Sequence, residues 1–347
     1  MLLTRRNRGA GYTIIELMIA ITINLMILAT LVSIFANNSR TRGEIERANQ
    51  QTENGRYALQ QIADDLHNAG YLAEFNPGPL ATPAAKPDPC DVTVAGLNSA
   101  LPLAVQGYDN GAGAPTCVSN LRAGTDIIVV RHASTCSVGS TGCDAAVAGA
   151  PYFQTSDCNN TTELASGTIA GYYVLDTNAA SFTLHQKDCV TAAVQYQYRT
   201  HVYFIANDDQ AGDGIPTLMR AELGAGTFTV VPLVEGVENL QVEYGLDTTT
   251  PTTGTPAVFT ANPDSYNGCA STPSICVGYW RSTVAAKINL LTRNTTPTPG
   301  YSDTKVYTLG LNANGTVNTV GPFNDRYKRH VSESVVKLNN PAGRNTP

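Results

Sequence analysis

The hydrophobic and polar positions divide the chain into three stretches. Residues 12–35 are almost all apolar, and this length exceeds the roughly 20 apolar residues that carry a helix across a bilayer. Residues 36–70 repeat apolar side chains at steps of three and four, which predicts an amphipathic continuation of the helix that stops at Gly70. Gly43 and Gly55 weaken this continuation and mark a candidate bend or locally melted turn. The apolar stripe consists of Ile45, Ala48, Thr52, Leu59, Ile62, Ala63 and Leu66.

The third stretch, residues 71–347, has the pattern of a β-rich globular head. Residues 76–89 hold five prolines, which exclude a helix or a central strand there. Beyond them, short runs of β-branched and aromatic residues are separated by turn residues. Long crossover helices are missing from the pattern, so we expect mainly antiparallel pairing. The predicted strands are Asp126–His132, Gly171–Asp176, Ser181–Gln186, Val194–Ala206, Phe228–Val234, Leu240–Tyr244, Ser282–Leu291, Lys305–Leu311 and Arg326–Leu338.

The N-terminus carries the most specific signal. Residues 1–11 form a leader with three arginines and no acid. An ordinary secretory signal has its small cleavage-site residues after the apolar run, whereas here the small residues 9–11 precede it. Arginines hold such a leader on the cytoplasmic side, so everything after Phe35 is expected outside the inner membrane.

One carboxylate, Glu16, interrupts the apolar run five residues after Gly11. A charge in a membrane span costs on the order of a few kcal/mol, so it usually marks function. The segment Gly11–Ala20, GYTIIELMIA, resembles the processing site of type IV prepilins. The resemblance implies that a prepilin peptidase cuts between Gly11 and Tyr12 and methylates the new N-terminus. The family most often has phenylalanine where this chain has Tyr12, and tyrosine keeps the aromatic body.

After such a cut, Tyr12 carries a positive α-amine four residues before Glu16, on the same face of the helix. A carboxylate in hydrocarbon needs a cation, either its own amine or that of a neighbouring subunit. A pair between subunits would set the register of packed helices. The alternative is a stray acid near the interfacial end of a signal anchor, within reach of water.

Segments of the head narrow the resemblance to PilW-type minor pilins: Asp213–Arg220, Val234–Thr248, Asn289–Arg293 and Arg326–Asn340. The resemblance implies an α+β pilin fold, in which a long N-terminal α-helix packs on a mainly antiparallel β-sheet head. The helix is expected to be transmembrane over residues 12–35 and amphipathic over 36–70. Residues 76–188 align with no part of the family and are interpreted as a Pro/Cys-rich insertion.

The resemblance also implies a function. A PilW-type chain is a low-copy subunit that forms a priming complex with other minor pilins, starts pilus assembly and sits at the tip with a large adhesin. It would contact these partners and the major pilin through its N-terminal helix. We expect a single-pass inner-membrane protein with a periplasmic head, which then enters the pilus.

Eight cysteines lie beyond the apolar helix, and an oxidising periplasm favours disulfides. Eight cysteines allow about a hundred pairings, so the sequence leaves the pairing open. Our hypothesis is neighbour pairing. Zinc is the alternative, but no pair has the two-residue spacing typical of zinc ribbons. The hypothetical pairs are Cys90–Cys117, Cys136–Cys143, Cys158–Cys189 and Cys269–Cys276.

Charge and motifs indicate no further chemistry. The net charge is −6, and because the leader holds +3, residues 12–347 carry −9, which disfavours nucleic acid as a partner. Hydrolase, zinc-protease and nucleotide-loop motifs are missing, so we expect no enzyme, no cofactor and no metal. Residues 207–214 are interpreted as a turn instead of a calcium loop, and the basic residues of 326–330 as a solvated sheet face. The five histidines show no metal-ligand spacing; they are His67, His132, His185, His201 and His330.

Two alternatives stay open. A J-type minor pseudopilin of a type II secretion system would have the same leader and helix. A direct tip adhesin would bind a surface or ligand through residues 76–188.

Overall fold

A computed structural model gives the fold and describes residues 11–161, 163–164 and 172–345. The leader predicted at residues 1–11 lies outside the described part except for Gly11. The chain divides into two compact units, residues 1–50 and 51–347, and each is described by itself.

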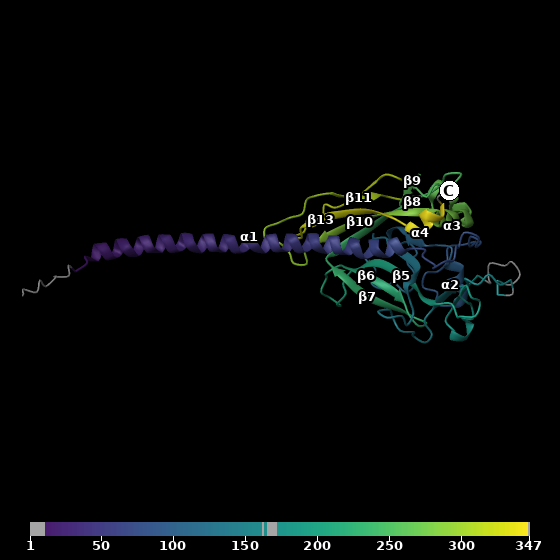
Figure 1. The fold of residues 1–347 in the computed structure, drawn as a ribbon. Helices are drawn as coiled ribbons and strands as arrows, with labels where there is room; N and C mark the ends of the chain where they lie inside the picture. The colour runs from purple at the N-terminus through teal and green to yellow at the C-terminus, as the bar shows by residue number, and fades with distance from the viewer. Residues whose placement is uncertain (1–10, 162, 165–171, 346–347) are drawn as a thin grey trace, which may run out of the picture. The chain divides into compact units, whose positions relative to one another are not determined.

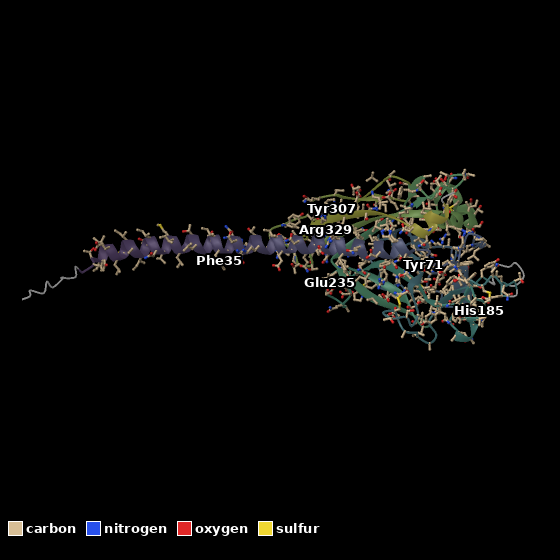
Figure 2. The ribbon with its side chains drawn as sticks, viewed as in Figure 1. Phe35, Tyr71, His185, Glu235, Tyr307 and Arg329 are labelled. Carbon is tan, nitrogen blue, oxygen red and sulfur yellow. A yellow bond between two sulfur atoms is a disulfide. The ribbon has the colours of Figure 1, made fainter. Side chains whose placement is uncertain are left out.

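The longest element is α1 (Ile14–Asn68), a single helix of 55 residues (Figure 1). In the first unit its apolar side chains face outward, and Phe35, labelled in Figure 2, is 77% exposed. This part of the helix is long and apolar enough to cross a membrane. The helix continues through Gly43 and Gly55, so the expectation of a melted turn is wrong. It ends just before Gly70, whose φ of +70° makes it the predicted left-handed stop.

The second unit contains two sheets and a separate strand pair, and the strand pairings among its described residues are antiparallel. The seven-stranded sheet has the order β1-β2-β5-β3-β4, with β6 also on β5 and β7 on β6. The four-stranded sheet has the order β13-β10-β8-β9, and β11 pairs with β12. The strands are β1 (Val105–Tyr108), β2 (Ile127–Ser137), β3 (Tyr152–Thr155), β4 (Tyr173–Asp176), β5 (Gln195–Ala206), β6 (Thr217–Leu223), β7 (Phe228–Glu235), β8 (Val237–Leu246), β9 (Val258–Thr260), β10 (Thr283–Arg293), β11 (Tyr307–Leu311), β12 (Val317–Val320) and β13 (Arg329–Lys337).

Short helices complete the head: α2 (Val94–Ala100), α3 (Pro273–Arg281) and α4 (Asn339–Asn345). The strand predicted at Ser181–Gln186 is wrong. This segment follows a 3₁₀ turn at Ala179–Ser181, and only His185 makes an isolated bridge, to Ala192. The polar residues of the segment are half-exposed, so it lacks the buried alternate positions that would hold a strand in a sheet.

The C-terminal part of α1 packs between the two sheets of the head (Figure 1). The stripe residues Ile62 and Leu66 are fully buried, as is Ala58 one turn before Ile62. They share one core cluster with Ile128 of the seven-stranded sheet and Ile288 of the four-stranded sheet. One narrow apolar stripe of α1 therefore packs against both sheets. The polar residues of α1 beside this stripe lie against the strands.

Residues 76–188 supply part of this core. β2 pairs with β1 and β5 inside the seven-stranded sheet, and both of its faces are buried. Ile128 and Val130 belong to the cluster around α1, whereas Ile127 and Val129 belong to a second cluster on the other face. The origin of this stretch as an insertion stays a prediction, but the fold depends on its central strand.

The eight cysteines form four disulfides, and these are the neighbour pairs of the hypothesis: Cys90–Cys117, Cys136–Cys143, Cys158–Cys189 and Cys269–Cys276. They close sequence separations of 27, 7, 31 and 7 residues. Cross-links of this kind stabilise a fold chiefly by restricting the unfolded chain.

Candidate functional site

The residues predicted to be processed lie directly before the first turn of α1. Gly11 and Tyr12 are exposed and precede the helix, which begins at Ile14. A Cβ atom added to Gly11 would meet no atom within 4 Å in the part of the chain that the structure describes. The fold itself therefore has no need for glycine at this position, and any need for a small residue must come from a partner.

Glu16 forms a capping box with Thr13. The Thr13 backbone N–H and hydroxyl each donate to Glu16 Oε2 at 3.0 Å, and the Glu16 N–H donates to Thr13 Oγ1 at 3.3 Å. Such a reciprocal pair satisfies N–H groups that the first turn leaves free, and a carboxylate there also suits the positive end of the helix dipole.

Sequence reasoning assigned Glu16 to the Tyr12 amine and missed Thr13, although the Thr-x-x-Glu spacing is a known helix-start signal. The pair between Tyr12 and Glu16 stays a prediction, because the Tyr12 nitrogen is still bonded to Gly11 in the uncut chain.

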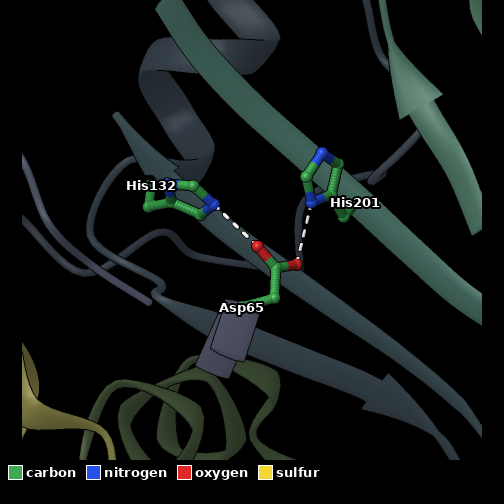
Figure 3. Close-up of side chains that lie close together, drawn as sticks. All are labelled: Asp65, His132 and His201. Atoms are coloured by element: carbon green, nitrogen blue, oxygen red, sulfur yellow. Dashed lines mark hydrogen bonds and ion pairs between the residues drawn. The ribbon is translucent and has the colours of Figure 1, made fainter. Parts of the chain in front are cut away.

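A second cluster of functional groups lies in the head, where α1 meets β2 and β5 (Figure 3). Asp65 Oδ1 lies 2.8 Å from His132 Nε2, and Asp65 Oδ2 lies 2.8 Å from His201 Nδ1. The three side chains are between 7 and 10% exposed. Among the described residues, this is the one group of histidine, cysteine and carboxylate side chains placed to hold a metal ion.

The sheet register explains why the two histidines meet. Val130 pairs with His201 and His132 pairs with Arg199, so the histidines are diagonal neighbours on one face of the sheet. That face carries Val130 toward α1, and Asp65 reaches it from the helix. The histidines are far apart in the sequence, so only the pairing of β2 with β5 could have revealed them, and sequence reasoning did not predict this pairing.

Hydrogen bonds fix the charge of the cluster. Burial disfavours the ionised Asp65, but hydrogen bonds from His132 and His201 outweigh it and hold the pKa of Asp65 well below its usual range. The Tyr203 hydroxyl also donates to Asp65 Oδ2 at 3.1 Å. His132 Nδ1 lies 2.8 Å from the Ala133 carbonyl oxygen, to which it donates.

The basic stretch near the C-terminus is exposed at Arg326 and His330, as expected of a solvated face, but Arg329 is buried. The Arg329 side chain has no exposed surface and lies 2.5 Å from Glu238, 2.9 Å from Asp303 and 2.6 Å from Asp325. Figure 2 places it beside Tyr307, whose hydroxyl donates to Asp303 at 3.0 Å. A buried arginine persists only when its donors are paired, and here acids from three separate segments pair them.

Comparison with known proteins finds a matching family and a similar solved structure. The model of the family described as Type IV Pilus-assembly protein W matches residues 202–340. A solved type IV-like pilin from Thermus thermophilus is 14% identical, with a TM-score of 0.34, and the comparison covers 84% of this chain and 96% of that chain. No curated protein matches the chain. The family match begins within β5, one residue after His201, and runs through β13, so it includes Arg329. Over residues 202–340, the chain is similar to the PilW family of type IV pilus-assembly proteins.

Proposed function

We propose that the chain is a minor pilin that the prepilin peptidase cuts between Gly11 and Tyr12. It then joins other minor pilins and the major pilin through residues 12–35 of α1, in a complex that starts pilus assembly and stays at the tip. One observation carries the proposal. The first part of α1 exposes a continuous apolar surface that holds a single carboxylate, directly after an exposed Gly11–Tyr12 bond.

The intact mass and N-terminal sequence of the protein from a membrane fraction test processing. A chain that begins at N-methyl-Tyr12 is expected. A chain that still begins at Met1 in a strain with an active peptidase would reduce the protein to a signal-anchored one, and the assembly role would fall.

Substitution of Gly11 tests whether the peptidase requires a small residue before the cleavage site. Gly11→Leu is expected to leave an uncut and unassembled precursor, whereas Gly11→Ala is the matched control with a small side chain and is expected to be cut. A Cβ atom at position 11 meets no described atom within 4 Å, so we expect both variants to fold like the wild type. A mature mass for Gly11→Leu would contradict this prediction.

Substitutions of Glu16 and Thr13 distinguish two roles of Glu16, the charge pair with the Tyr12 amine and the capping box with Thr13. Glu16→Gln keeps a side chain that can cap the first turn but removes the charge, whereas Thr13→Ala removes the cap and keeps the charge. We expect Glu16→Gln to be cut normally yet to be lost from sheared pili, and Thr13→Ala to be recovered. The opposite pattern would assign Glu16 to the capping of its own helix and would overturn the pair.

A deletion strain distinguishes the minor pilin from the pseudopilin alternative. A strain that lacks this chain is expected to show fewer surface pili and unchanged secretion of type II substrates. Loss of secretion with normal pili would favour the pseudopilin.

The adhesin alternative needs a smaller change than removal of residues 76–188, because that change would delete β2 from the core. Residues 145–149, in the loop between β2 and β3, are exposed and form a better target, because their replacement keeps the Cys136–Cys143 disulfide. We expect pili and attachment to persist after their replacement. Normal pili that no longer attach would assign adhesion to this loop.

A further inference from the structure

We propose that Asp65, His132 and His201 form a binding site for one divalent zinc ion in the head, with one open position for water. This inference rests on the head alone and is independent of the proposed function.

The ligand atoms already converge. One carboxylate oxygen and one nitrogen from each ring lie within 4.8 Å of one another, and Asp65 lies 2.8 Å from each ring. Tetrahedral zinc binds such atoms at about 2.0–2.2 Å, which places ligand atoms roughly 3.3 Å apart. The carboxylate therefore has to withdraw by a fraction of an ångström and the rings have to approach each other, which side-chain rotation supplies.

The groups behind the ligands are those that a metal site uses. A histidine ligand usually donates its other ring N–H to a carbonyl or carboxylate, which fixes its tautomer. His132 does so through Nδ1 to the Ala133 carbonyl, which aims Nε2 at Asp65. Because that nitrogen faces a carboxylate, a proton or a metal ion has to stand between the two. The Tyr203 hydroxyl holds the other oxygen of Asp65 in place.

Charge and access also suit a cation. A pocket of about 310 Å³ opens over the three residues, so water can reach the fourth position. Two arginines line it, but Arg199 is paired with Asp144 at 2.9 Å and Arg220 with Glu222 at 2.5 Å. Two imidazoles with one carboxylate favour zinc over magnesium or calcium, which prefer oxygen ligands alone.

The bound ion would cross-link three elements. It would join α1 to β2 and β5 at a point where the helix is otherwise held by apolar contacts. Zinc bound here would stabilise the folded head by cross-linking these three elements.

The test uses the full-length chain in detergent micelles, stripped with a chelator and titrated with ZnCl₂ in a calorimeter. We expect one zinc per chain, and binding weakened at least about 100-fold in His132→Gln and in His201→Gln. His185→Gln is the matched control, because His185 pairs with Glu163 elsewhere in the head and is expected to leave binding unchanged. Equal binding by wild type and His201→Gln, or no stoichiometric binding by wild type, would overturn the site.

A second measurement keeps the proposal falsifiable if a variant fails to fold. Cobalt(II) in place of zinc is expected to give the wild-type chain the intense visible absorption of a tetrahedral site with nitrogen ligands. A spectrum no different from cobalt in buffer would mean that a proton, and no metal, bridges the cluster.

Discussion

Arg329 shows how strongly one side chain can hold this head together. Its guanidinium faces carboxylates from β8, from the segment before β11 and from the segment before β13. The sequence pattern placed it on a solvated sheet face, because it lies within a predicted alternating strand. Only the tertiary fold brings Glu238 and Asp303 to it, so the sequence alone offered no signal for its burial.

Removal of the Arg329 charge is expected to destabilise the head severely. Arg329→Met leaves buried carboxylates without their partner and should lower the free energy of unfolding by about 3–5 kcal/mol. Urea unfolding followed by the fluorescence of Trp280, the one tryptophan, measures this. Arg326→Met, at an exposed position of the same stretch, is the control and should change stability by less than about 0.5 kcal/mol. Equal effects of both substitutions would show that the buried network is unimportant.

Asp126 is expected to make stability depend on pH. Its oxygens accept from the backbone N–H groups of Asn110 and Val242, but burial dominates and raises the pKa of Asp126 to about 7. Between pH 4 and 7 the folded chain then binds more protons at this group than the unfolded chain does. The contribution of Asp126 to stability is therefore present at low pH and is lost as pH rises toward 7.

Asp126→Asn isolates this effect from other titrating groups. We expect wild type to lose on the order of 1–3 kcal/mol relative to the variant between pH 4.5 and 8, measured by urea unfolding at each pH. Parallel pH profiles of the two proteins would contradict the raised pKa.

At the scale of elements, α1 was predictable because its apolar positions follow one period over many turns. The end of the helix at Gly70 was predictable because glycine adopts the left-handed conformation that often follows the last helical turn, and Gly70 has a positive φ. The short strand β3 and the helix α3 were missed, since four residues are too few for a period and a disulfide tethers α3. β6 was noticed as a family segment and not as a strand, because its place beside β5 depends on pairing that a single sequence does not reveal.

Residue 55 is a glycine because β10 and β13 pack too closely against α1 there to leave room for a side chain. A Cβ atom there would lie 2.8 Å from Ser332 Oγ and 3.4 Å from Thr292 Cγ2. Gly55→Leu should therefore destabilise the head by about 1–3 kcal/mol through overpacking, as measured by urea unfolding. Gly43→Leu in the same helix meets only the far end of Arg47 at 3.9 Å and should leave unfolding of the head unchanged. An unchanged free energy of unfolding in Gly55→Leu would contradict the close packing at this position.

At the scale of the whole molecule, the fold class followed from the order of the three hydrophobic patterns. The pattern could not show that residues 76–188 thread a strand through the middle of the larger sheet. Composition set this stretch apart, whereas pairing with β5 made it integral. The same pairing brings His132 and His201 together beside Asp65, so the cluster and the burial of this stretch have one physical origin.

The disulfides should contribute unequally to the whole fold. In the chain-entropy description, a cross-link that spans more residues restricts the unfolded chain more. Loss of Cys90–Cys117, which spans 27 residues, should cost about 1 kcal/mol more than loss of Cys136–Cys143, which spans 7. Paired Cys→Ser variants compared by urea unfolding measure this, and a larger loss from the shorter loop would count against it.

The order of the four bridges has a further consequence for biogenesis. The cysteines are bonded in consecutive pairs along the chain, and no loop crosses another. A head that is exported in chain order behind the anchored helix would present its thiols in the order in which they are joined. Oxidation in sequence of emergence would then yield the native set directly, with no mispaired bridge for an isomerase to correct.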